Sequence, residues 1–599
     1  MRMLFSVTYN LLKRVDLKLY KKNQKFTIFI AIFLLGSITA ITLGTNFFIS
    51  SDISQPLSDY DKTLLKTSAT FTDIEIDALD TTNTTNSGNW TWATSIGLCT
   101  GSGTSSSPYV IANHIFEYNI IGPGDCLRIR NSRVHFRIRD CTFRNSDTFD
   151  SGLYIYNTTN GEVTDCEAYD NFRGIELNNV NDTELEGNHI YSSGNEGMYL
   201  SNSRFNTISN NNVSANTAHG IYLTSTSSYN TISNNIANDN QNFDGITLNL
   251  ESNYNDVIDN TANGNGENGI YLDDSHLNTI SNNEANDNTQ MGIYLESSTI
   301  NSILSNTAND NNYGILLDTS CDDNLISKNI ANSNDFTGIL AFASDDTTIT
   351  QCTANHNNEN GVRLMICEDS TISDNKVYNN TIIGIYIQDG LNMTCSDNTA
   401  YENKMYGLYL DNVDESVIEN NNAHHNSFHG IVITGGSQMN IIKSNLARYN
   451  NLSGIHILDN NNLLMDNIAS YNEEHGIFLE SCNNVALTGN TANSNEENGI
   501  HLLDSNSNTI ISNTANNNKN GTFLDNSDNN KVIDNYFVGN DDCYNETGSS
   551  GNIFENNVCT STGGGLAIDL STILLILCII ESVALAGIVA IYFMRKRKS

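Results

Sequence analysis

Apolar and polar residues alternate in short segments that repeat along most of the chain. A glycine followed by an apolar–x–apolar triplet, as in GIYL (220–223) and GIFL (476–479), recurs from Gly152 to Gly521 with a period of about 23 residues. Two more alternating segments follow in each repeat, one related to NTISNN (278–283) and one of the form N-x-A-x-x-N. Because successive side chains of a strand point to opposite faces, each repeat is predicted to hold three short strands.

The period and the element type together select the architecture. Leucine-rich repeats and parallel β-helices both have repeats near this length, but leucine-rich repeats carry a longer, leucine-dominated segment that is missing here. Three strands joined by sharp turns predict an all-β fold, a parallel β-helix. Counting the third segment from Phe143 to Phe537 gives about 18 coils.

Asparagine supplies 97 of the 599 residues, whereas proline supplies only 3. Much of this asparagine falls into two columns of the repeat, one running from Asn216 to Asn540 and one from Asn211 to Asn535, with Cys352 interrupting the second. Asparagine tolerates the left-handed backbone of tight turns. Identical side chains stacked every ~4.8 Å can also hydrogen-bond along the axis. Both columns are therefore predicted to be structural ladders.

Long apolar segments lie near both ends. Phe26 to Ile49 has no charged residue, and Leu570 to Met594 has only Glu581; basic residues flank both on their terminal sides. These segments predict two transmembrane helices with cytoplasmic termini and an extracellular middle, although a cleaved signal peptide stays open for the first. The predicted organisation is a basic cytoplasmic segment (1–25), a transmembrane helix or signal anchor (26–49), a linker and N-terminal cap (50–98), the β-helix (99–560), a linker (561–569), a transmembrane helix (570–594) and a basic tail (595–599).

The charge of the chain narrows its partners. The formal net charge is -39, and nucleic-acid binding requires a basic surface, so nucleic acid is not expected as a partner. A local exception is the arginine run of the first coils, which is predicted to pair with acidic coils or to bind anionic glycans: Arg128, Arg130, Arg133, Arg137, Arg139 and Arg144.

Several segments carry a family resemblance. GSGTSSSPYVI (101–111) and RIRNSRVHFRIRDC (128–141), followed by the repeating coils, resemble the right-handed parallel β-helix family, in particular its NosD-type copper-binding and pectate-lyase-like repeats. Membrane-anchored forms are typical of archaeal cell-surface proteins. The resemblance implies a right-handed solenoid, but such folds host lyases, hydrolases, epimerases, adhesins and accessory proteins. With proline only at 56, 108 and 123, the Arg-x-Pro-x-x-Arg pattern of pectate lyases does not occur.

A tyrosine stripe is the first candidate binding surface. The second residue after the repeat glycine points outward, and tyrosine is frequent there. Aromatic rings with a polar tip suit contact with sugars, whereas the structural alternative is cross-strand packing. The predicted glycan-binding residues are Tyr154, Tyr199, Tyr222, Tyr271, Tyr294, Tyr386 and Tyr409.

Acidic pairs form a second candidate site. Three pairs recur one repeat apart and are predicted to stack in one turn of successive coils: Asp322 and Asp323, Asp345 and Asp346, and Glu368 and Asp369. Hard oxygen ligands suit Ca²⁺, so calcium is the predicted ion and a solvated acidic patch the alternative.

Cysteines agree with an extracellular location, where disulfides persist. Cys141 and Cys166 occupy the same column in adjacent coils, within disulfide distance. Cys543–Cys559 is predicted to staple the C-terminal cap and Cys99–Cys126 the N-terminal one.

The sequence therefore predicts a membrane-anchored extracellular rod that binds glycans or glycoproteins, mediates adhesion or builds the cell surface. Two alternatives remain open. One is a polysaccharide lyase or hydrolase with a calcium-binding acidic patch, which the missing motifs disfavour. The other is a NosD-like accessory protein for metal or transporter maturation.

Overall fold

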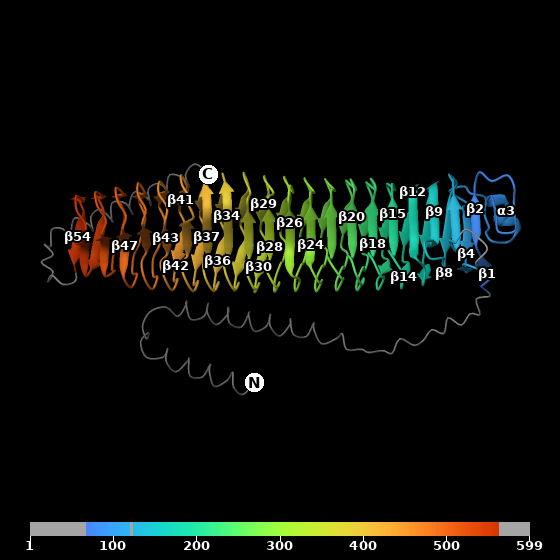
Figure 1. Cartoon of the computed structure of the whole chain (residues 1–599), viewed down its shortest axis with the longest axis horizontal. Coiled ribbons are helices and arrows are strands. Elements are labelled where there is room, and N and C mark those ends of the chain that lie inside the picture. The colour runs from blue at the N-terminus through green and yellow to red at the C-terminus, as the bar shows by residue number, and fades with distance from the viewer. Residues whose placement is uncertain (1–67, 120–123, 562–599) are drawn as a thin grey trace, which may run out of the picture. The chain divides into compact units, whose positions relative to one another are not determined.

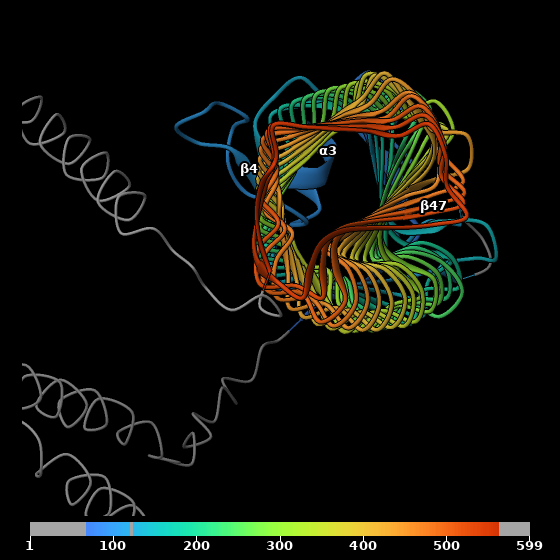
Figure 2. The same ribbon diagram turned by 90° about the vertical axis from the view of Figure 1, so that its left-hand side faces the viewer.

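The computed structural model describes residues 68–119 and 124–561, which form a rod of stacked coils (Figure 1). Each coil adds strands to parallel sheets that surround one continuous core, as the view along the rod shows (Figure 2). Every strand pairing in these residues is parallel, and the register advances by one repeat per coil, as in Tyr199 beside Tyr222. The predicted parallel β-helix is confirmed.

Sheet 1 contains the strands that follow the repeat glycine. Its strands are β3 (Ser87–Gly88), β2 (Ile74–Asp77), β6 (Leu127–Arg130), β9 (Ser151–Thr159), β12 (Arg173–Asn181), β15 (Met198–Ser201), β18 (Ile221–Thr224), β20 (Ile246–Asn249), β22 (Ile270–Asp273), β24 (Met291–Glu296), β26 (Tyr313–Asp318), β28 (Ile339–Phe342), β31 (Val362–Met365), β34 (Ile385–Leu391), β37 (Leu408–Asp414), β40 (Ile431–Thr434), β43 (Ile455–Ile457), β45 (Ile477–Glu480), β47 (Asn498–Leu503), β49 (Asn520–Asp525) and β52 (Asp542–Thr547).

Sheet 2 contains the second strand of each coil. Its strands are β4 (Tyr109–Ala112), β7 (Phe136–Arg139), β10 (Gly161–Thr164), β13 (Glu184–Glu186), β16 (Thr207–Ser209), β19 (Thr231–Ser233), β21 (Asp256–Ile258), β23 (Thr279–Ser281), β25 (Ser302–Leu304), β27 (Leu325–Ser327), β29 (Thr348–Thr350), β32 (Thr371–Ser373), β35 (Thr394–Ser396), β38 (Val417–Glu419), β41 (Ile441–Lys443), β44 (Leu463–Met465), β46 (Ala486–Thr488), β48 (Thr509–Ile511), β50 (Lys531–Ile533) and β53 (Ile553–Glu555).

Sheet 3 contains the third, shortest strands, and isolated bridges replace strands where it is interrupted. Its strands are β1 (Thr70–Thr72), β5 (Ile115–Glu117), β8 (Thr142–Arg144), β11 (Glu167–Tyr169), β14 (His189–Tyr191), β17 (Asn212–Val213), β30 (Thr353–Asn355), β33 (Lys376–Tyr378), β36 (Thr399–Tyr401), β39 (Asn422–His424), β42 (Leu446–Arg448), β51 (Tyr536–Asn540) and β54 (Val558–Ser561).

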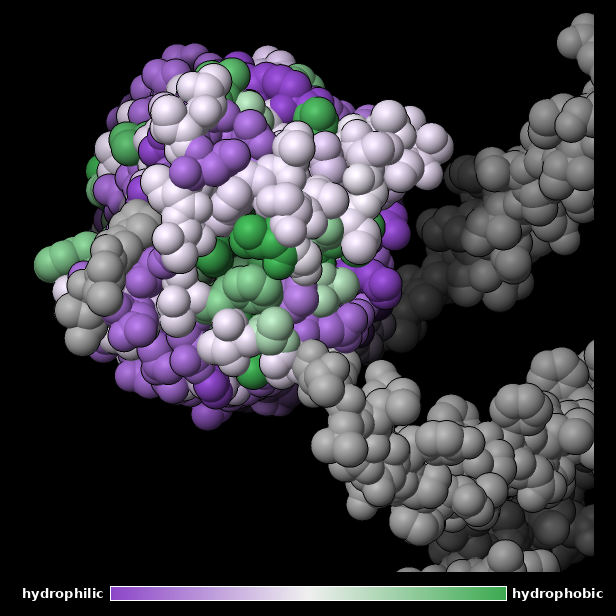
Figure 3. Space-filling view, turned by 90° about the vertical axis from the view of Figure 1, so that its right-hand side faces the viewer, coloured by the Kyte–Doolittle hydropathy of each residue, from purple (hydrophilic) through white to green (hydrophobic). Residues whose placement is uncertain are grey.

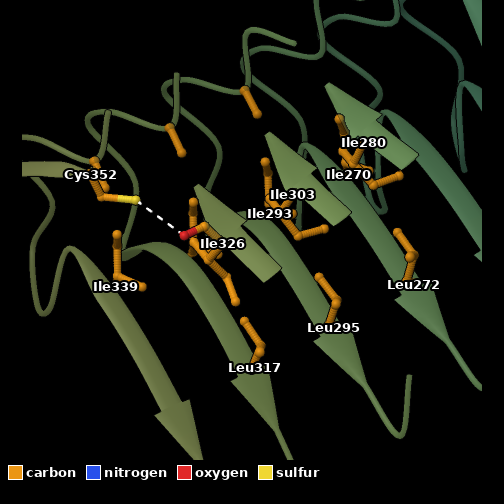
Figure 4. Close-up of a cluster of buried hydrophobic side chains, with 14 of the residues drawn as sticks. Ile270, Leu272, Ile280, Ile293, Leu295, Ile303, Leu317, Ile326, Ile339 and Cys352 are labelled. Carbon is orange, nitrogen blue, oxygen red and sulfur yellow. Dashed lines mark hydrogen bonds between the residues drawn. The ribbon is translucent and has the colours of Figure 1, made fainter. Parts of the chain in front are cut away.

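The core is built from aliphatic columns that run along the axis. Ile270 and Leu272 of β22 and Ile280 of β23 are fully buried, and their counterparts in the next coils stack on them (Figure 4). The repeat glycine allows this packing, because a Cβ added at Gly292 would lie 2.7 Å from both the Ala308 side chain and the Gly314 carbonyl oxygen. Glycine therefore recurs at this position of the repeat because the packing of adjacent coils leaves no room for a side chain.

The asparagine columns are hydrogen-bonded ladders, as predicted. Asn283 donates its side-chain amide to the Oδ1 of Asn306 (3.0 Å), and Asn306 donates to Asn329 at the same distance. The backbone N–H of each residue donates to the same acceptor. The ladders therefore satisfy polar groups buried in the turns. The structure adds a third ladder, absent from the prediction, with Asn206, Asn230 and Asn255 among its members.

The N-terminal end of the rod is closed by helix α3 (Trp90–Ser95). Asn89 caps this helix by accepting hydrogen bonds from the backbone N–H groups of Thr91 and Trp92, as expected of an N-cap asparagine. Trp90 and Trp92 are buried in the core. Seen from this end, hydrophobic residues gather near the middle of a mostly hydrophilic surface (Figure 3).

The predicted fold class was wrong in two respects. Sheet 2 alone has 20 strands, more than the predicted coil count, because β4 precedes Phe143, where the count began, and β53 follows Phe537, where it ended. The second error concerns the two flanking transmembrane helices. Within residues 68–119 and 124–561 no helix is long and apolar enough to cross a membrane, and the predicted spans 26–49 and 570–594 lie outside the described residues.

Candidate functional site

The predicted tyrosines share one outward column of sheet 1. Strand register places Tyr199 beside Tyr222, Tyr271 beside Tyr294 and Tyr386 beside Tyr409, while Tyr154 lies between Arg128 and Glu176. All seven rings are partly buried. The structure therefore brings the predicted residues into a line along the rod axis, interrupted by other residue types.

The ring faces in this column are largely covered. Tyr271 and Tyr294 stack at 4.9 Å with planes 9° apart, so each covers a face of the other. The Arg173 guanidinium lies 3.9 Å from the centre of the Tyr199 ring, and that of Arg363 lies 4.8 Å from Tyr386. The column therefore presents ring edges and hydroxyl groups more than open faces.

Carboxylates of the following coil accept the tyrosine hydroxyls. Tyr271 donates to Glu296 at 2.6 Å, and Tyr386 donates to Asp411 at 3.1 Å. Burial, together with these carboxylates, raises the pKa of Tyr271, and the same causes raise the pKa of Tyr386 to about 12. The hydroxyls consequently stay protonated at neutral pH and act as hydrogen-bond donors.

A pocket opens at the N-terminal end of this column. Its volume is about 420 Å³, within the range of small-ligand sites. The lining side chains come from β6, β9, β12 and the turns before β6 and β9: Asp125, Arg128, Arg130, Phe149, Asp150, Tyr154, Tyr156, Arg173 and Glu176. Phe149 is 80% exposed at the pocket rim.

Asp125 is the most buried acid of the pocket, only 2% exposed. Its carboxylate accepts the Arg128 Nε–H at 2.7 Å and the Ser151 backbone N–H at 2.7 Å. Burial nonetheless raises its pKa to about 6, against the lowering effects of Arg128 and Ser151. The carboxyl therefore exchanges a proton near neutral pH, as general acids and bases do.

A second ion-pair network holds Arg173 in place. Its Nε lies 2.7 Å from Glu196, and its Nη1 lies 3.1 Å from Glu176, which also accepts the Ser151 hydroxyl. Arg173 thus links two acids of adjacent coils and keeps its flat face on Tyr199. Arginine, tyrosine and carboxylate groups together supply the donors and acceptors that hydroxylated ligands use.

The predicted arginine run does not form one surface. Arg128 and Arg130 line the sheet 1 pocket, Arg137 and Arg139 belong to β7 of sheet 2, and Arg144 belongs to β8 of sheet 3. Arg137 pairs with Glu162 at 2.7 Å, and Arg144 pairs with Glu117. Pairing with acidic coils, one of the two predicted roles, is observed for these residues.

The acidic pairs separate into two columns. Asp322 accepts the backbone N–H of Asp345, which in turn accepts that of Glu368. The other column holds Asp323, Asp346 and Asp369. Desolvation and the surrounding carboxylates raise the pKa of Asp346. No group of three or more His, Cys, Asp or Glu side chains converges as metal ligands within the described residues, so calcium binding stays a prediction.

The structure contains one of the three predicted disulfides, Cys543–Cys559 at the C-terminal end. The prediction for Cys99 with Cys126 was wrong, because the Cys99 thiol lies against Thr94 while the Cys126 thiol donates to the Arg144 carbonyl.

Cys141 and Cys166 also remain buried thiols, contrary to prediction. Each donates to the carbonyl two residues earlier at 3.3 Å. A hydrogen bond from Cys166 lowers the pKa of Cys141, while burial raises that of Cys166. The two are stacked in their column but not joined.

Sequence reasoning missed a histidine cluster on sheet 1. His475 Nε2 lies 3.0 Å from His501 Nδ1, and His456 Nε2 lies 3.0 Å from Glu480. The rings of His429 and His456 are 4.6 Å apart. These histidines alternate between the position before the repeat glycine and the second position after it, so only the coil register brings them together.

Comparisons with known proteins agree with this architecture. The family described as "Right handed beta helix region" matches residues 97–262, 319–446 and 404–537. The family described as "Periplasmic copper-binding protein (NosD)" matches residues 241–351. No curated protein matches the chain significantly.

Several solved structures are similar at low identity. The mannuronan C-5 epimerase AlgE4 A-module of Azotobacter vinelandii is 16% identical, with 49% of this chain and 89% of that one covered and a TM-score of 0.31. DFA-IIIase of Arthrobacter chlorophenolicus A6 is 12% identical, with 47% and 84% covered and a TM-score of 0.33. The Dettilon tailspike protein is 14% identical, with 56% and 59% covered and a TM-score of 0.30. Because the first family model covers more than half of the sequence, the chain belongs to the right-handed β-helix family.

Proposed function

We propose that the protein binds a polysaccharide outside the cytoplasm, through the outer column of sheet 1 and the pocket at its N-terminal end. The observation that carries this proposal is the pocket itself, in which three arginines, three aromatic residues and three acids meet on one face. Sugar hydroxyls and carboxylates are recognised by such side chains, and the column continues the surface along successive coils. A long, repetitive ligand suits a long, repetitive face.

An extracytoplasmic location is supported by two observations. The Cys543–Cys559 disulfide is of a kind that persists in oxidising compartments. The NosD family, which matches part of the rod, is described as periplasmic.

The test is a glycan array probed with the full chain, followed by titration of the best polysaccharide. Phe149→Ala and Tyr156→Ala remove exposed aromatic surface from the pocket and are expected to weaken binding about tenfold, or ~1.4 kcal/mol. Tyr471→Ala removes a comparably exposed ring outside the pocket and should leave affinity unchanged. Equal affinity of all three variants, or no polysaccharide bound at all, would refute the proposal.

One observation favours an enzyme as the second candidate. Asp125 is a buried carboxyl whose pKa is raised to about 6, beside Arg128 and near Tyr154, which suits proton transfer on a bound sugar. Incubating the full chain with the polysaccharides that it binds, and measuring new reducing or unsaturated ends, separates the candidates. Asp125→Asn should abolish product formation by an enzyme, whereas a binding protein forms none before or after the change.

A further inference from the structure

A different surface of the rod carries an unusual set of residues. From β10 onward, the last turn position before each sheet 2 strand, two residues ahead of it in most coils, has a left-handed backbone with positive φ. We call this line of residues the corner column. Most coils fill it with residues that tolerate this backbone or are polar: Asn160, Asp182, Asp323, Asp346, Asp369, Asn392, Glu415, Asn461, Asn484, Ser507, Asn529 and Gly551.

Met439 departs from this rule alone, and five consecutive coils also depart from it. Their corner residues are large and apolar or aromatic, with φ between 57° and 60°: Phe205, Tyr229, Tyr254, Leu277 and Ile300. Bulky and β-branched side chains are disfavoured in this conformation. The coil geometry imposes the backbone, so these side chains add strain without contributing to the core. We call these five residues the apolar ridge.

The apolar ridge is exposed to solvent. Phe205 is 56% exposed, Tyr229 and Tyr254 47% each, Leu277 37% and Ile300 50%. Apolar residues that are strained, exposed and contiguous point to a surface that is covered in use.

The stacked rings of the apolar ridge indicate which class of ligand the ridge binds. Phe205 stacks on Tyr229 at 5.2 Å, and Tyr229 stacks on Tyr254 at 4.9 Å with planes 1° apart. The rings therefore cover one another's faces and present their edges outward. Leu277 and Ile300 continue the ridge without hydrogen-bonding side-chain groups, unlike the sheet 1 pocket with its arginines and acids. A protein side-chain surface therefore fits the ridge better than a glycan does.

The acidic residues in the corner column on either side of the ridge indicate the charge of the partner. The three coils after Ile300 place Asp323, Asp346 and Asp369 in the column, and the coil before Phe205 places Asp182 there. A second, antiparallel copy of the chain would bring carboxylates against carboxylates at both ends of the ridge. A partner whose apolar stretch continues into lysine or arginine residues would instead match the ridge and the acidic coils together.

The axial spacing of the corner residues matches the repeat of an α-helix better than that of an extended strand. Corner residues recur with the coil rise of ~4.8 Å, a helix repeats every ~5.4 Å, and an extended chain repeats every ~6.8 Å for side chains on one face. A helix thus stays near register over five coils, drifting by ~2.4 Å, whereas a strand drifts by ~8 Å.

From the exposed ridge, its strain and the adjoining aspartates, we propose that the corner column docks an amphipathic helix of another protein. The helix places its apolar stripe on Phe205 to Ile300 and its basic end over Asp323, Asp346 and Asp369. This surface is separate from the sheet 1 pocket, so glycan binding and helix docking can be tested independently.

The probe is a synthetic helical peptide of about 22 residues, with leucine at i, i+4, i+7 and i+11 and lysine at i+14, i+18 and i+21. Its affinity for the full chain is measured by fluorescence anisotropy at two salt concentrations. The double variant Tyr229→Asn with Tyr254→Asn introduces asparagine, which several other coils have at this position. Because asparagine tolerates the left-handed backbone, the variant should fold. This double variant is expected to weaken binding at least tenfold.

The matched control is Tyr449→Asn with Tyr471→Asn. These two rings are also exposed, stacked (5.3 Å) and held at positive φ, but lie in a different column. The control should bind within twofold of the unchanged chain. Asp346→Asn should weaken binding severalfold at low salt and reduce its salt dependence. Equal affinity of the ridge and control variants, absence of peptide binding, or polysaccharide binding that depends on Tyr229 and Tyr254 would overturn the proposal.

Discussion

The thiol of Cys352 lies 4.0 Å from the side-chain amide nitrogen of Asn329, in a column that holds asparagine in the coils on either side. Asn375 still accepts the backbone N–H of Cys352 at 2.9 Å, but sulfur is a weak acceptor for Asn329. At this coil the ladder keeps the backbone bond from Cys352 to Asn375, whereas the side-chain bond from Asn329 is weakened.

Replacing Cys352 by asparagine is expected to stabilise the rod. The new carboxamide would accept from Asn329 and donate to Asn375, and a buried hydrogen bond contributes ~1 kcal/mol net. Thermal unfolding followed by circular dichroism should show a higher midpoint for Cys352→Asn and a lower one for Cys352→Ala, which leaves the Asn329 amide only its bond to the Ile303 carbonyl. A midpoint of Cys352→Asn at or below that of the natural chain would contradict the ladder argument.

The fold followed from the sequence because each structural requirement repeats. Gly292 and its counterparts, and Asn283 with its ladder neighbours, meet the same steric and hydrogen-bonding demands in every coil, so periodicity alone exposed them. The first coils were missed because Asp73 and Cys126 precede β2 and β6, at the position where later coils have the repeat glycine.

The candidate site was harder to predict, because it depends on contacts between coils that the repeat does not encode. The tyrosine column was found from its regular spacing. Asp125 and the histidines around His475 were not, since their burial and their partners depend on individual departures from the repeat. Disulfide prediction failed for Cys141 and Cys166 for a related reason: a shared column fixes proximity, but the thiols form hydrogen bonds instead.

The Cys543–Cys559 disulfide is expected to stabilise the C-terminal end of the rod. It closes a loop with a sequence separation of 16, and constraining a loop of this size in the unfolded chain contributes ~3 kcal/mol. Cys543→Ser with Cys559→Ser should therefore make β51 to β54 exchange amide hydrogens faster, while coils near β22 keep their protection.

Hydrogen exchange read by mass spectrometry resolves the two regions in one experiment. The control is Cys482→Ser, which alters a buried thiol outside the disulfide. Unchanged exchange at the C-terminal end of the double variant would show that the disulfide is dispensable there.

Asp346 is expected to make the chain respond to cations. Asp323 and Asp369 flank it in the corner column, and with desolvation they raise its pKa, because stacked like charges repel. Millimolar calcium should raise the thermal unfolding midpoint of the natural chain if the predicted site forms. Asp346→Asn should raise the midpoint without calcium and reduce the calcium effect, whereas Asp374→Asn, in another column, should do neither. A calcium effect of equal size in all three proteins would place the ion elsewhere.

The histidine cluster makes acid destabilisation a prediction with a definite sign. Burial lowers the pKa of His475 to about 3, and neighbouring imidazoles lower it further; burial also lowers the pKa of His501 to about 4, against the raising effects of Asp525 and Glu497. His475 accepts the Asn498 backbone N–H at Nδ1, so its neutral form carries the proton on Nε2, beside His501. The Nε2 of His501 is buried without a partner, so no carboxylate accepts a hydrogen bond from that nitrogen.

Because these pKa values are lower in the folded than in the unfolded state, the unfolded chain binds protons first. Stability is therefore complete above about pH 6.5 and falls as the pH drops toward 4, by up to ~3 kcal/mol for His475 alone. Buried Asp125, whose pKa is raised to about 6, contributes with the opposite sign over part of this window. A comparison at each pH with a variant that lacks His475 and His501 but keeps Asp125 cancels that contribution.

His475→Asn with His501→Tyr supplies that comparison, since Asn498 and Tyr294 occupy the equivalent positions of other coils. The double variant should lose less stability than the natural chain between about pH 7 and about pH 4, measured as the midpoint of denaturant unfolding. The control His276→Asn replaces a partly exposed histidine in a turn between sheet 1 and sheet 2. It should leave the pH dependence of the unfolding midpoint unchanged. Parallel pH profiles for the natural chain and the double variant would mean that these two buried imidazoles do not govern acid stability.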